Sequence, residues 1–286
     1  MINVISVRGL KTSYGSTQAV AGIDFTIAQG EIFALLGPNG AGKTTTVEIL
    51  EGFRTRDSGE VSVLNTDPSV KGSAGRNWRN RIGIVLQSTS DAGDLSVQET
   101  VAHFAKYYAN PRDVAEVVAA VGLSDKSKEL IRTLSGGQRR RLDVALGIIG
   151  SPELLFLDEP TTGFDPKARR AFWALIKDLR KTGTTILLTT HYLDEAEALA
   201  DRVGVISQGQ IIEISTPALL GGRATSLATV SWKGANGLES ERTDNPTALI
   251  RKLTETYKDE IPELTVKRAS LEDIYLEMIG GEDESE

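Results

Sequence analysis

The strongest chemical signal lies between Gly37 and Thr45, where the chain reads GPNGAGKTT. The spacing fits the pattern G-x-x-x-x-G-K-[ST], and it stands between an apolar run and a helix-forming stretch. Glycines let backbone N–H groups turn inward around phosphate oxygens, and the following helix dipole favours negative charge. We expect Lys43 to reach the terminal phosphates and the Thr44 hydroxyl to ligate Mg²⁺. The residues expected to contact the nucleotide here are Gly37, Pro38, Asn39, Gly40, Ala41, Gly42, Lys43, Thr44 and Thr45.

Two carboxylates follow the apolar run LLFL, at Asp158 and Glu159. On its own, an Asp–Glu pair at a strand end is most often only solvated. Downstream of a phosphate-binding loop, it predicts that Asp158 holds Mg²⁺ through its water shell. Glu159 is then placed to polarise the water that attacks the γ-phosphate. We therefore predict a hydrolase in which Glu159 and Lys43 are catalytic.

Three further polar residues are weak signals individually. Gln87 follows RIGIVL and could bridge the metal and the water, while His191 ends TTILLTT and could hydrogen-bond the γ-phosphate. Tyr14 lies in an early polar turn, where its ring could stack on adenine. Taken alone, each is explained as well or better as a solvent-facing residue. Their joint occurrence predicts Gln87 and His191 as catalytic, Gln87 also as a metal ligand, and Tyr14 as a base-binding residue.

The stretch LSGGQRRR, from Leu134 to Arg141, predicts a second anion site. Ser135 and Gln138 form an S-x-x-Q capping box, which by itself explains only a helix start. It does not explain two glycines, which cost up to about 1 kcal/mol each relative to alanine in a helix. The Ser135 hydroxyl, the Gly137 amide and the helix dipole suit a γ-phosphate, with Gln138 beside them. Arg139 to Arg141 keep the surroundings positive, and their default interpretation is a solvated basic face.

This second site needs a second nucleotide. The chain has one glycine loop of the first kind, and we expect its phosphates to be enclosed by that loop, Lys43 and Mg²⁺. LSGGQ can therefore serve only the nucleotide of another copy. Two chains facing head-to-tail would sandwich two ATP molecules, each held by one chain's glycine loop and the other chain's LSGGQ.

The elements that must position these residues indicate a layered α/β domain. IFALL, RIGIVL, LLFLDE and TTILLTT are short apolar runs, which favour a parallel sheet covered on both faces. The pattern then becomes helical, so we expect a helical insert at about residues 88–133. After Gly221-Gly222 the pattern resets. We therefore expect a main domain at residues 1–220 and a small α+β unit with an acidic tail at residues 221–286.

Composition restricts the possible partners. The net charge of −7 argues against bulk affinity for nucleic acid. There are no cysteines, which excludes disulfides, thiolate zinc sites and cysteine nucleophiles and favours a reducing cytosol. No apolar run approaches the ~18 residues of a membrane span. Any link to a membrane is therefore expected to run through a partner.

The chain resembles the ATPase subunit of an ATP-binding-cassette (ABC) transporter in motifs that occur in this order: Tyr14, GPNGAGKTT, Gln87, LSGGQ, LLFLDEP, TTGFDP and His191. The resemblance covers residues 1 to about 220. It implies a P-loop NTPase core of the ABC-ATPase type, an ATP-driven dimer that requires Mg²⁺, and integral-membrane permease subunits. It also implies a cytoplasmic protein, peripheral on the inner face of the cell membrane, in which Asp165 belongs to the loop that crosses the dimer contact. EGFRTRDSGEV and SLEDIYLEM are similar to the drug- and antibiotic-exporter branch, which implies export of a drug, antibiotic or lipid-like compound.

Three alternatives remain at this point. A soluble ABC ATPase acting on ribosomes or DNA usually carries tandem cassettes, a coiled-coil insert or a basic linker, and this sequence has none of them. A GTP-binding switch would need a guanine-reading Asn-Lys-x-Asp, and no Asn-Lys pair occurs. In the third alternative, the C-terminal unit is a regulatory module that gates the ATPase.

Overall fold

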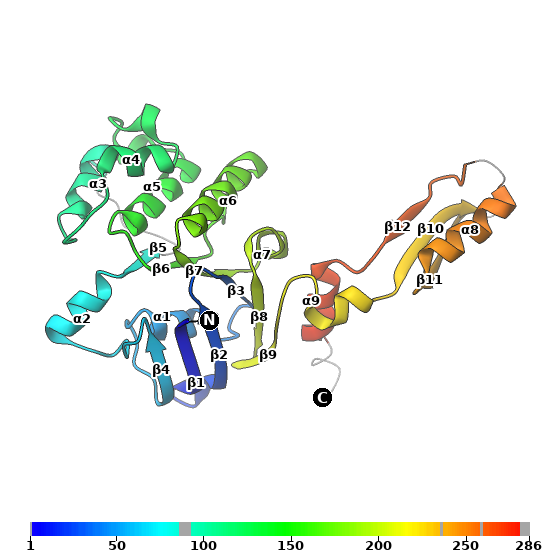
Figure 1. Cartoon of the computed structure of the whole chain (residues 1–286), viewed down its shortest axis with the longest axis horizontal. Coiled ribbons are helices and arrows are strands. Elements are labelled where there is room, and N and C mark those ends of the chain that lie inside the picture. The colour runs from blue at the N-terminus through cyan, green and yellow to red at the C-terminus, as the bar shows by residue number, and fades with distance from the viewer. Residues whose placement is uncertain (1, 86–92, 235–236, 258–259, 281–286) are drawn as a thin grey trace. The chain divides into compact units, whose positions relative to one another are not determined.

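The computed structural model describes residues 2–85, 93–234, 237–257 and 260–280. Contacts divide the chain into two compact units, Met1–Ile214 and Ser215–Glu286, which are described separately (Figure 1). The boundary expected after residue 220 lies a few residues further along the chain and stays a proposal. Residues 88–92 of the expected insert lie outside the described residues.

The first unit is built on a six-stranded sheet that is parallel from β5 to β8. Its central strands are buried along their whole length because both faces are covered, as the continuous apolar runs predict. The α/β class expected from the sequence is therefore confirmed. In spatial order the strands are β5 (Ile82–Val85), β6 (Leu154–Asp158), β7 (Thr185–Thr190), β3 (Ile32–Leu36), β8 (Arg202–Ser207) and β9 (Gln210–Ser215).

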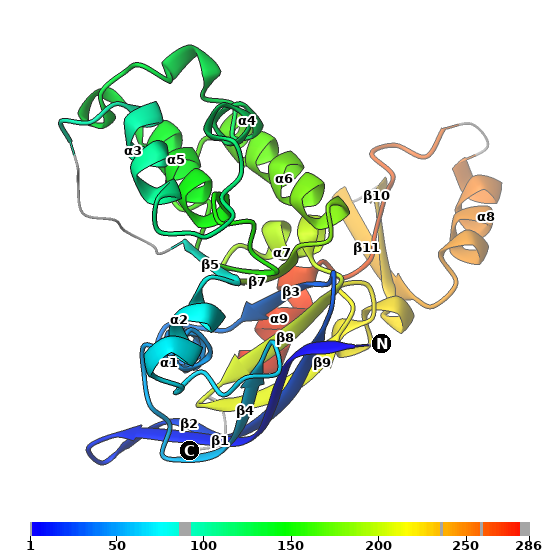
Figure 2. The same cartoon turned by 60° about the vertical axis from the view of Figure 1, so that its left-hand side comes forward.

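A second, antiparallel sheet has the order β2-β1-β4, with β1 at Asn3–Tyr14, β2 at Thr17–Ala28 and β4 at Ser58–Val63 (Figure 2). Phe25 of β2 stacks on Phe33 of β3 with ring centroids 5.8 Å apart, so the two sheets share one apolar core. Tyr14 pairs with Thr17 at the tip of the β1–β2 hairpin. The tip lies beside α1 (Lys43–Leu50), the helix that follows β3, since the Tyr14 hydroxyl is 3.2 Å from Thr45 Oγ1.

Seven α-helices are described in the first unit. Three of them, α3, α4 and α5, contact one another and lie together in both views (Figures 1 and 2). Two short 3₁₀ turns, Ser124–Lys126 and Ile131–Thr133, lead from α4 to α5. Across all described residues, helices of a length and apolarity suited to crossing a bilayer are absent. The helices are α1 (Lys43–Leu50), α2 (Gly72–Arg79), α3 (Val97–Ala105), α4 (Val114–Ala120), α5 (Gly136–Ile148), α6 (Pro166–Lys181) and α7 (Leu193–Leu199).

The second unit contains an antiparallel sheet of order β11-β10-β12, with β10 at Ala228–Gly234, β11 at Gly237–Thr243 and β12 at Thr265–Lys267. Helix α8 (Pro246–Tyr257) packs on β10 over a small core of Val230, Trp232, Leu249 and Ile261. Helix α9 (Leu271–Gly280) packs on the 3₁₀ turn Leu220–Thr225. The unit is α+β, and the acidic tail at residues 282–286 lies outside the described residues.

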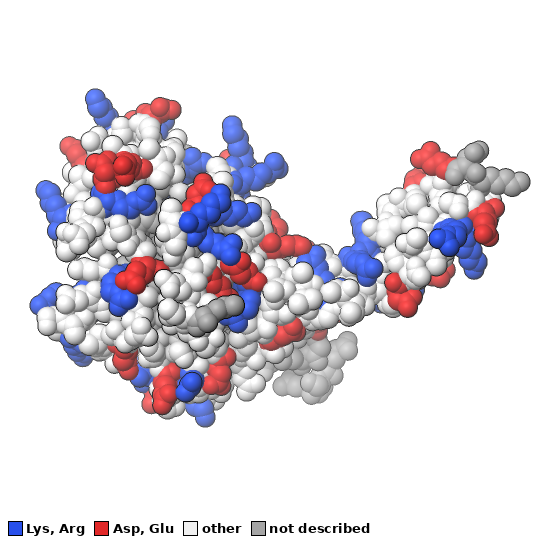
Figure 3. All heavy atoms as spheres, in the orientation of Figure 1, with Lys and Arg blue, Asp and Glu red and all other residues white. Residues whose placement is uncertain are grey.

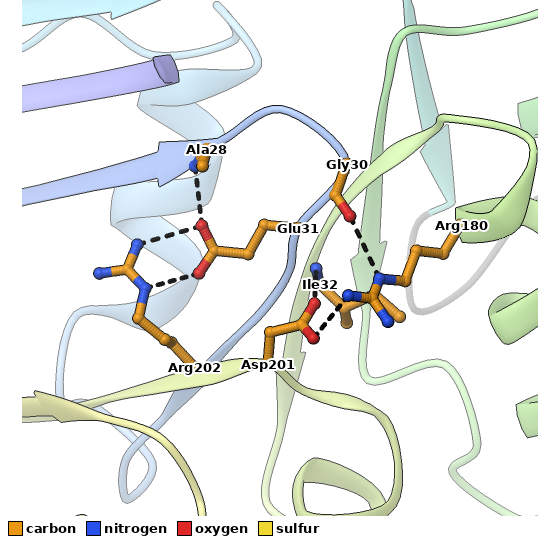
Figure 4. Close-up of polar contacts among 7 residues, drawn as sticks. All are labelled: Ala28, Gly30, Glu31, Ile32, Arg180, Asp201 and Arg202. Atoms are coloured by element: carbon orange, nitrogen blue, oxygen red, sulfur yellow. Dashed lines mark hydrogen bonds and ion pairs between the residues drawn. The ribbon is translucent and has the colours of Figure 1, made fainter. Parts of the chain in front are cut away.

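The amino end of β3 is fixed by Glu31, which is 8% exposed. Its carboxylate accepts hydrogen bonds from Arg202 Nε at 2.6 Å and from the Ala28 N–H at 2.7 Å (Figure 4). Arg202 Nη2 also donates to the Thr26 carbonyl at 2.7 Å. One carboxylate therefore joins the β2–β3 turn to the first residue of β8.

Asp201 makes a second connection beside the first (Figure 4). It accepts from the Ile32 N–H at 2.9 Å and from Arg180 Nη2 at 2.7 Å. Arg180 Nε donates to the Gly30 carbonyl at 3.2 Å. The C-terminal end of α6 is thereby tied to the starts of β3 and β8.

Replacing Glu31 by Ala is expected to lower the free energy of unfolding of the first unit by about 2 kcal/mol, because the buried carboxylate and its hydrogen bonds to Arg202 and the Ala28 N–H are lost. Urea denaturation followed by tryptophan fluorescence would measure this loss. Asp178→Ala is the control, since Asp178 and Lys181 form an ion pair with side chains 68% and 75% exposed. Its effect should stay below about 0.5 kcal/mol. Equal losses in the two variants would contradict a special role for Glu31.

Candidate functional site

The glycine loop after β3 has a backbone that admits only glycine at two positions. Gly40 and Gly42 have φ values of 82° and 103°, in the left-handed region. A Cβ on Gly42 would lie 2.4 Å from the Ala19 carbonyl oxygen, and one on Gly37 would lie 2.2 Å from that of Ile206. The loop is therefore packed against the surrounding chain, and it leads directly into α1.

Lys43 is the first residue of α1 and is buried. Its Nζ donates to the Gly37 carbonyl at 2.7 Å and to the Pro38 carbonyl at 3.0 Å. Burial lowers the pKa of Lys43, while the negative charges of Glu159 and Asp158 act in the opposite direction. The structure thus brings together the cation and the two carboxylates that the sequence assigns to one site.

Asp158 ends β6, and its Oδ1 accepts a hydrogen bond from Thr189 Oγ1 of β7 at 2.5 Å. The Thr44 side chain is exposed at the start of α1. Hydroxyl and carboxylate oxygens suit Mg²⁺, which commonly takes one or two carboxylates together with phosphate oxygens and waters. Among the described residues, His, Cys, Asp and Glu side chains form no group of three or more that could hold a metal ion. Gln87, the further expected ligand, lies outside the described residues.

Glu159 has a φ of 44°, which is uncommon for a residue other than glycine. Its N–H donates to the Thr189 carbonyl at 3.1 Å, which holds this conformation at the end of β6. Glu159 Oε1 lies 3.2 Å from His191 Nδ1, and Oε2 accepts from Thr162 Oγ1 at 3.4 Å. Strained backbone of this kind, costing on the order of 1–3 kcal/mol, is concentrated at functional sites. The pattern LLFLDEP carries no signal for it.

His191 follows β7 and is held by its neighbours. Its ring centroid is 4.1 Å from that of Tyr192, and the Arg169 guanidinium lies 4.7 Å from the Tyr192 centroid. Arg169, in α6, also pairs with Asp194 of α7 at 2.8 Å. The imidazole is therefore positioned by two helices beside Glu159, and its expected contact with the γ-phosphate stays a prediction.

Ser135 begins α5 with the predicted capping box. The Gln138 N–H donates to Ser135 Oγ at 3.3 Å, and the Ser135 N–H donates to Gln138 Oε1 at 2.9 Å. A Cβ on Gly136 would meet nothing within 4 Å, and one on Gly137 would meet only Ala168 Cβ, at 3.8 Å. Packing within the described part of the chain would therefore admit side chains at both glycines, in contrast to Gly37 and Gly42.

Arg140 is a residue that the sequence interpretation missed. The solvated basic face expected there is wrong for Arg140, which is 7% exposed. It donates from Nε to the Pro160 carbonyl at 3.0 Å and from Nη2 to the Asp158 carbonyl at 2.6 Å. Helical periodicity contained a signal for this, since Arg140 stands one turn before the buried Val144. Arg140 thus ties the LSGGQ helix to the loop that carries both carboxylates.

Tyr14 and Asp165 complete the set of predicted residues. The Tyr14 hydroxyl lies 3.2 Å from Thr45 Oγ1 in α1, and the Tyr14 residue is 45% exposed. Asp165 caps α6 by accepting from the Lys167 and Ala168 N–H groups at 2.8 Å each. The part of Asp165 in a dimer contact stays a prediction.

Glu51, directly after α1, is a second residue that the sequence interpretation missed. Burial, the largest cause, and the nearby negative charges of Asp158 and Glu48 together raise its pKa to about 8. Its carboxyl group is therefore mostly neutral at pH 7. This keeps another negative charge away from Asp158.

Comparisons with known proteins identify the family of the chain. A family model described as ABC transporter matches residues 20–162. The chain is 38% identical over 237 residues to the linearmycin resistance ATP-binding protein of Bacillus subtilis (strain 168), covering 80% of this chain and 75% of that protein. It is 34% identical over 307 residues to the daunorubicin/doxorubicin resistance ATP-binding protein of Streptomyces peucetius, covering 96% and 92%.

A third relative and a solved structure extend the comparison. The chain is 36% identical over 290 residues to the fluoroquinolones export ATP-binding protein of Mycobacterium tuberculosis (strain ATCC 25618 / H37Rv), covering 97% and 93%. A solved ATP-binding subunit of an ABC transporter has the same fold at a TM-score of 0.71 and 20% identity, over 96% of this chain and 99% of that one. The chain therefore belongs to the ABC transporter family, as an ATP-binding subunit that hydrolyses ATP.

Proposed function

We propose that this ATPase powers the export of a drug, antibiotic or lipid-like compound through a separate integral-membrane permease. The observation that carries the proposal is the alignment of nearly the whole chain with ATP-binding proteins named for drug resistance or drug export. The pairing of Glu159 with His191, near Lys43, supports ATP hydrolysis as the activity that this chain contributes to transport. The chain then works in the cytoplasm, at the inner face of the cell membrane, where it meets its permease.

In the proposed reaction, a water oxygen attacks the γ-phosphorus while the bond to the β-phosphate oxygen breaks. Lys43 holds the β- and γ-phosphates, and Glu159 polarises the attacking water. His191 keeps the Glu159 carboxylate in place through the 3.2 Å contact. Thr44 and Asp158, with Gln87, would hold Mg²⁺, which supplies positive charge to the phosphates when bound.

The complete site is proposed to form between two copies. The start of α5 in a second copy would cover the γ-phosphate with the Ser135 hydroxyl, the Gly137 amide and Gln138. The room for a Cβ at both glycines supports this arrangement, since the described chain places nothing within 4 Å of it at Gly136 and only Ala168 Cβ, at 3.8 Å, at Gly137. Asp165 would lie in the loop that crosses the contact.

Closure of this dimer is proposed to reach the permease through the helical region that contains α3 and α4. ATP can move the permease only through the difference between its affinities for the open and the closed state of the dimer.

The alternative of a soluble ATPase that acts on ribosomes or DNA is not favoured. On the face shown in Figure 3, Lys and Arg are interspersed with Asp and Glu, and the net charge is −7. The C-terminal unit, from about residue 221, is proposed as an accessory domain.

The proposal is tested by purifying the tagged full chain from detergent-solubilised native membranes. We expect recovery of one integral-membrane protein in amounts comparable to the chain, and faster ATP hydrolysis by that complex than by the chain alone. Adding candidate cargo to the reconstituted complex should change the hydrolysis rate. Recovery of ribosomal proteins or DNA in place of a membrane protein would overturn the proposal.

A further inference from the structure

One face of the Tyr14 ring is covered by a cation. The Arg54 guanidinium carbon lies 4.5 Å from the Tyr14 ring centroid, within the range of a cation–π contact. Tyr14 is nevertheless 45% exposed, so much of the ring remains accessible. A planar ring with one face occupied offers only its other face to a stacking partner.

Arg54 is itself held by Glu48 of α1 in two ways. Its Nε donates to Glu48 Oε2 at 2.8 Å, and its backbone N–H donates to the Glu48 carbonyl at 3.1 Å. The turn that returns Arg54 to α1 needs Gly52, whose φ is 76° and whose Cβ would lie 2.5 Å from the Pro68 carbonyl oxygen. The position of Arg54 is therefore set by the end of the helix that begins at the phosphate-binding loop.

The Tyr14 ring is thus fixed to α1 at two points. Its hydroxyl meets Thr45 in the first turn of the helix, and its face meets Arg54 just beyond the last turn. Such a ring gives up less rotational freedom on binding a base than an unsupported loop tyrosine would. It also keeps a constant orientation relative to the phosphates bound at the start of α1.

We propose that Arg54 is a positioning residue for the nucleotide base, acting through the Tyr14 ring. The proposal rests on the proposed function, in which Tyr14 stacks on adenine. Arg54 lies on the face of the Tyr14 ring opposite the base. Glu48 holds Arg54, Arg54 holds the ring, and the ring stacks on the base. Arg54 touches neither the phosphates nor the attacking water in this arrangement.

The test compares a ligand that has a base with one that lacks it. Mg-ADP and Mg-pyrophosphate carry the same two phosphate groups, neither is consumed by the ATPase, and only ADP can stack. For Arg54→Ala in the full chain, we expect ADP affinity to fall about two- to fivefold, because the unsupported ring must then be ordered when the base binds. Pyrophosphate affinity should not change. Isothermal titration calorimetry measures both, and thermal melting verifies that the variant is folded.

Arg56→Ala is the matched control, because it removes an equal charge from the same loop but from an arginine paired with Asp67. It should leave both affinities unchanged. In the Tyr14→Ala background, Arg54→Ala should have no further effect on ADP, because the contact through which it acts is gone. An equal weakening of ADP and pyrophosphate by Arg54→Ala would overturn the proposal, since Arg54 would then act on the phosphates by charge.

The Tyr14→Ala variant separates this inference from the proposed function. Loss of base stacking should weaken the binding of ADP about fivefold or more, without weakening the binding of pyrophosphate. If Tyr14→Ala has this effect and Arg54→Ala has none, the role of Arg54 is wrong and that of Tyr14 stands. If Tyr14→Ala leaves ADP affinity unchanged, the assigned base contact itself is wrong.

Discussion

Replacing Glu159 by Gln is expected to slow ATP hydrolysis at least about 10²-fold while ATP still binds, because a positioned general base contributes about 10²–10⁴-fold. The amide keeps the size of the carboxylate but cannot polarise the water as an anion does. It also removes a negative charge beside the γ-phosphate. The ATP-bound dimer should therefore accumulate. Phosphate release and size-exclusion chromatography with ATP measure the two effects.

The structure provides a matched control in Glu153→Gln. Glu153 precedes β6, as Glu159 follows it, and its carboxylate pairs with Arg81 at the surface. This variant should hydrolyse ATP at the normal rate and should not trap a dimer. Normal turnover by Glu159→Gln would show that another group activates the water.

The second large effect is recovery of activity in a mixture of two inactive variants. Lys43→Ala removes the buried cation of the phosphate loop, and Ser135→Arg places a long side chain at the exposed start of α5. In a dimer of two identical variant chains, both composite sites contain the altered residue and are inactive. A mixed dimer keeps one site, made of the intact phosphate loop of one chain and the intact LSGGQ of the other.

Random pairing of equal amounts makes half of the dimers mixed, each with one site of two. The mixture should therefore regain about a quarter of the normal ATPase rate if the two sites of a two-fold dimer act independently. Mixing Lys43→Ala with Glu159→Gln is the control, because both changes affect the same half of a site and no combination is intact. Activity of the first mixture no greater than that of its separate components would mean that LSGGQ serves no partner.

Local patterns in the sequence were sufficient to predict the parallel sheet and the start of a helix. The parallel sheet followed from continuous apolar runs, because strands buried on both faces leave no room for polar alternation. The cap at Ser135 followed from residue types whose side chains bond to nearby backbone N–H groups. Both kinds of inference depend only on neighbours in the sequence. The roles assigned to the site residues stay predictions.

The features that were missed depend on distant segments. Helical periodicity indicates that Arg140 faces inward, but the acceptors of its hydrogen bonds, the Asp158 and Pro160 carbonyl groups at the end of β6 and just beyond it, have no signal in the run of three arginines. The pKa of Glu51 is raised by its burial in the fold and by the charge of Asp158, which is distant in the sequence. The left-handed conformation of Glu159 requires the backbone of β7 to hold it. In each case the tertiary partner, and not the local sequence, determines the state of the charged residue.

In the parallel sheet, the residues assigned to the nucleotide site and the residues that support the fold lie at opposite ends of the strands. Asp158 is the last residue of its strand, and Gly37 and His191 directly follow the carboxyl ends of theirs. The carboxylates of Glu31 and Asp201 instead lie at the amino ends of β3 and β8. Substitutions at the amino ends of these strands can therefore change the thermal stability of the protein without contacting the reacting atoms.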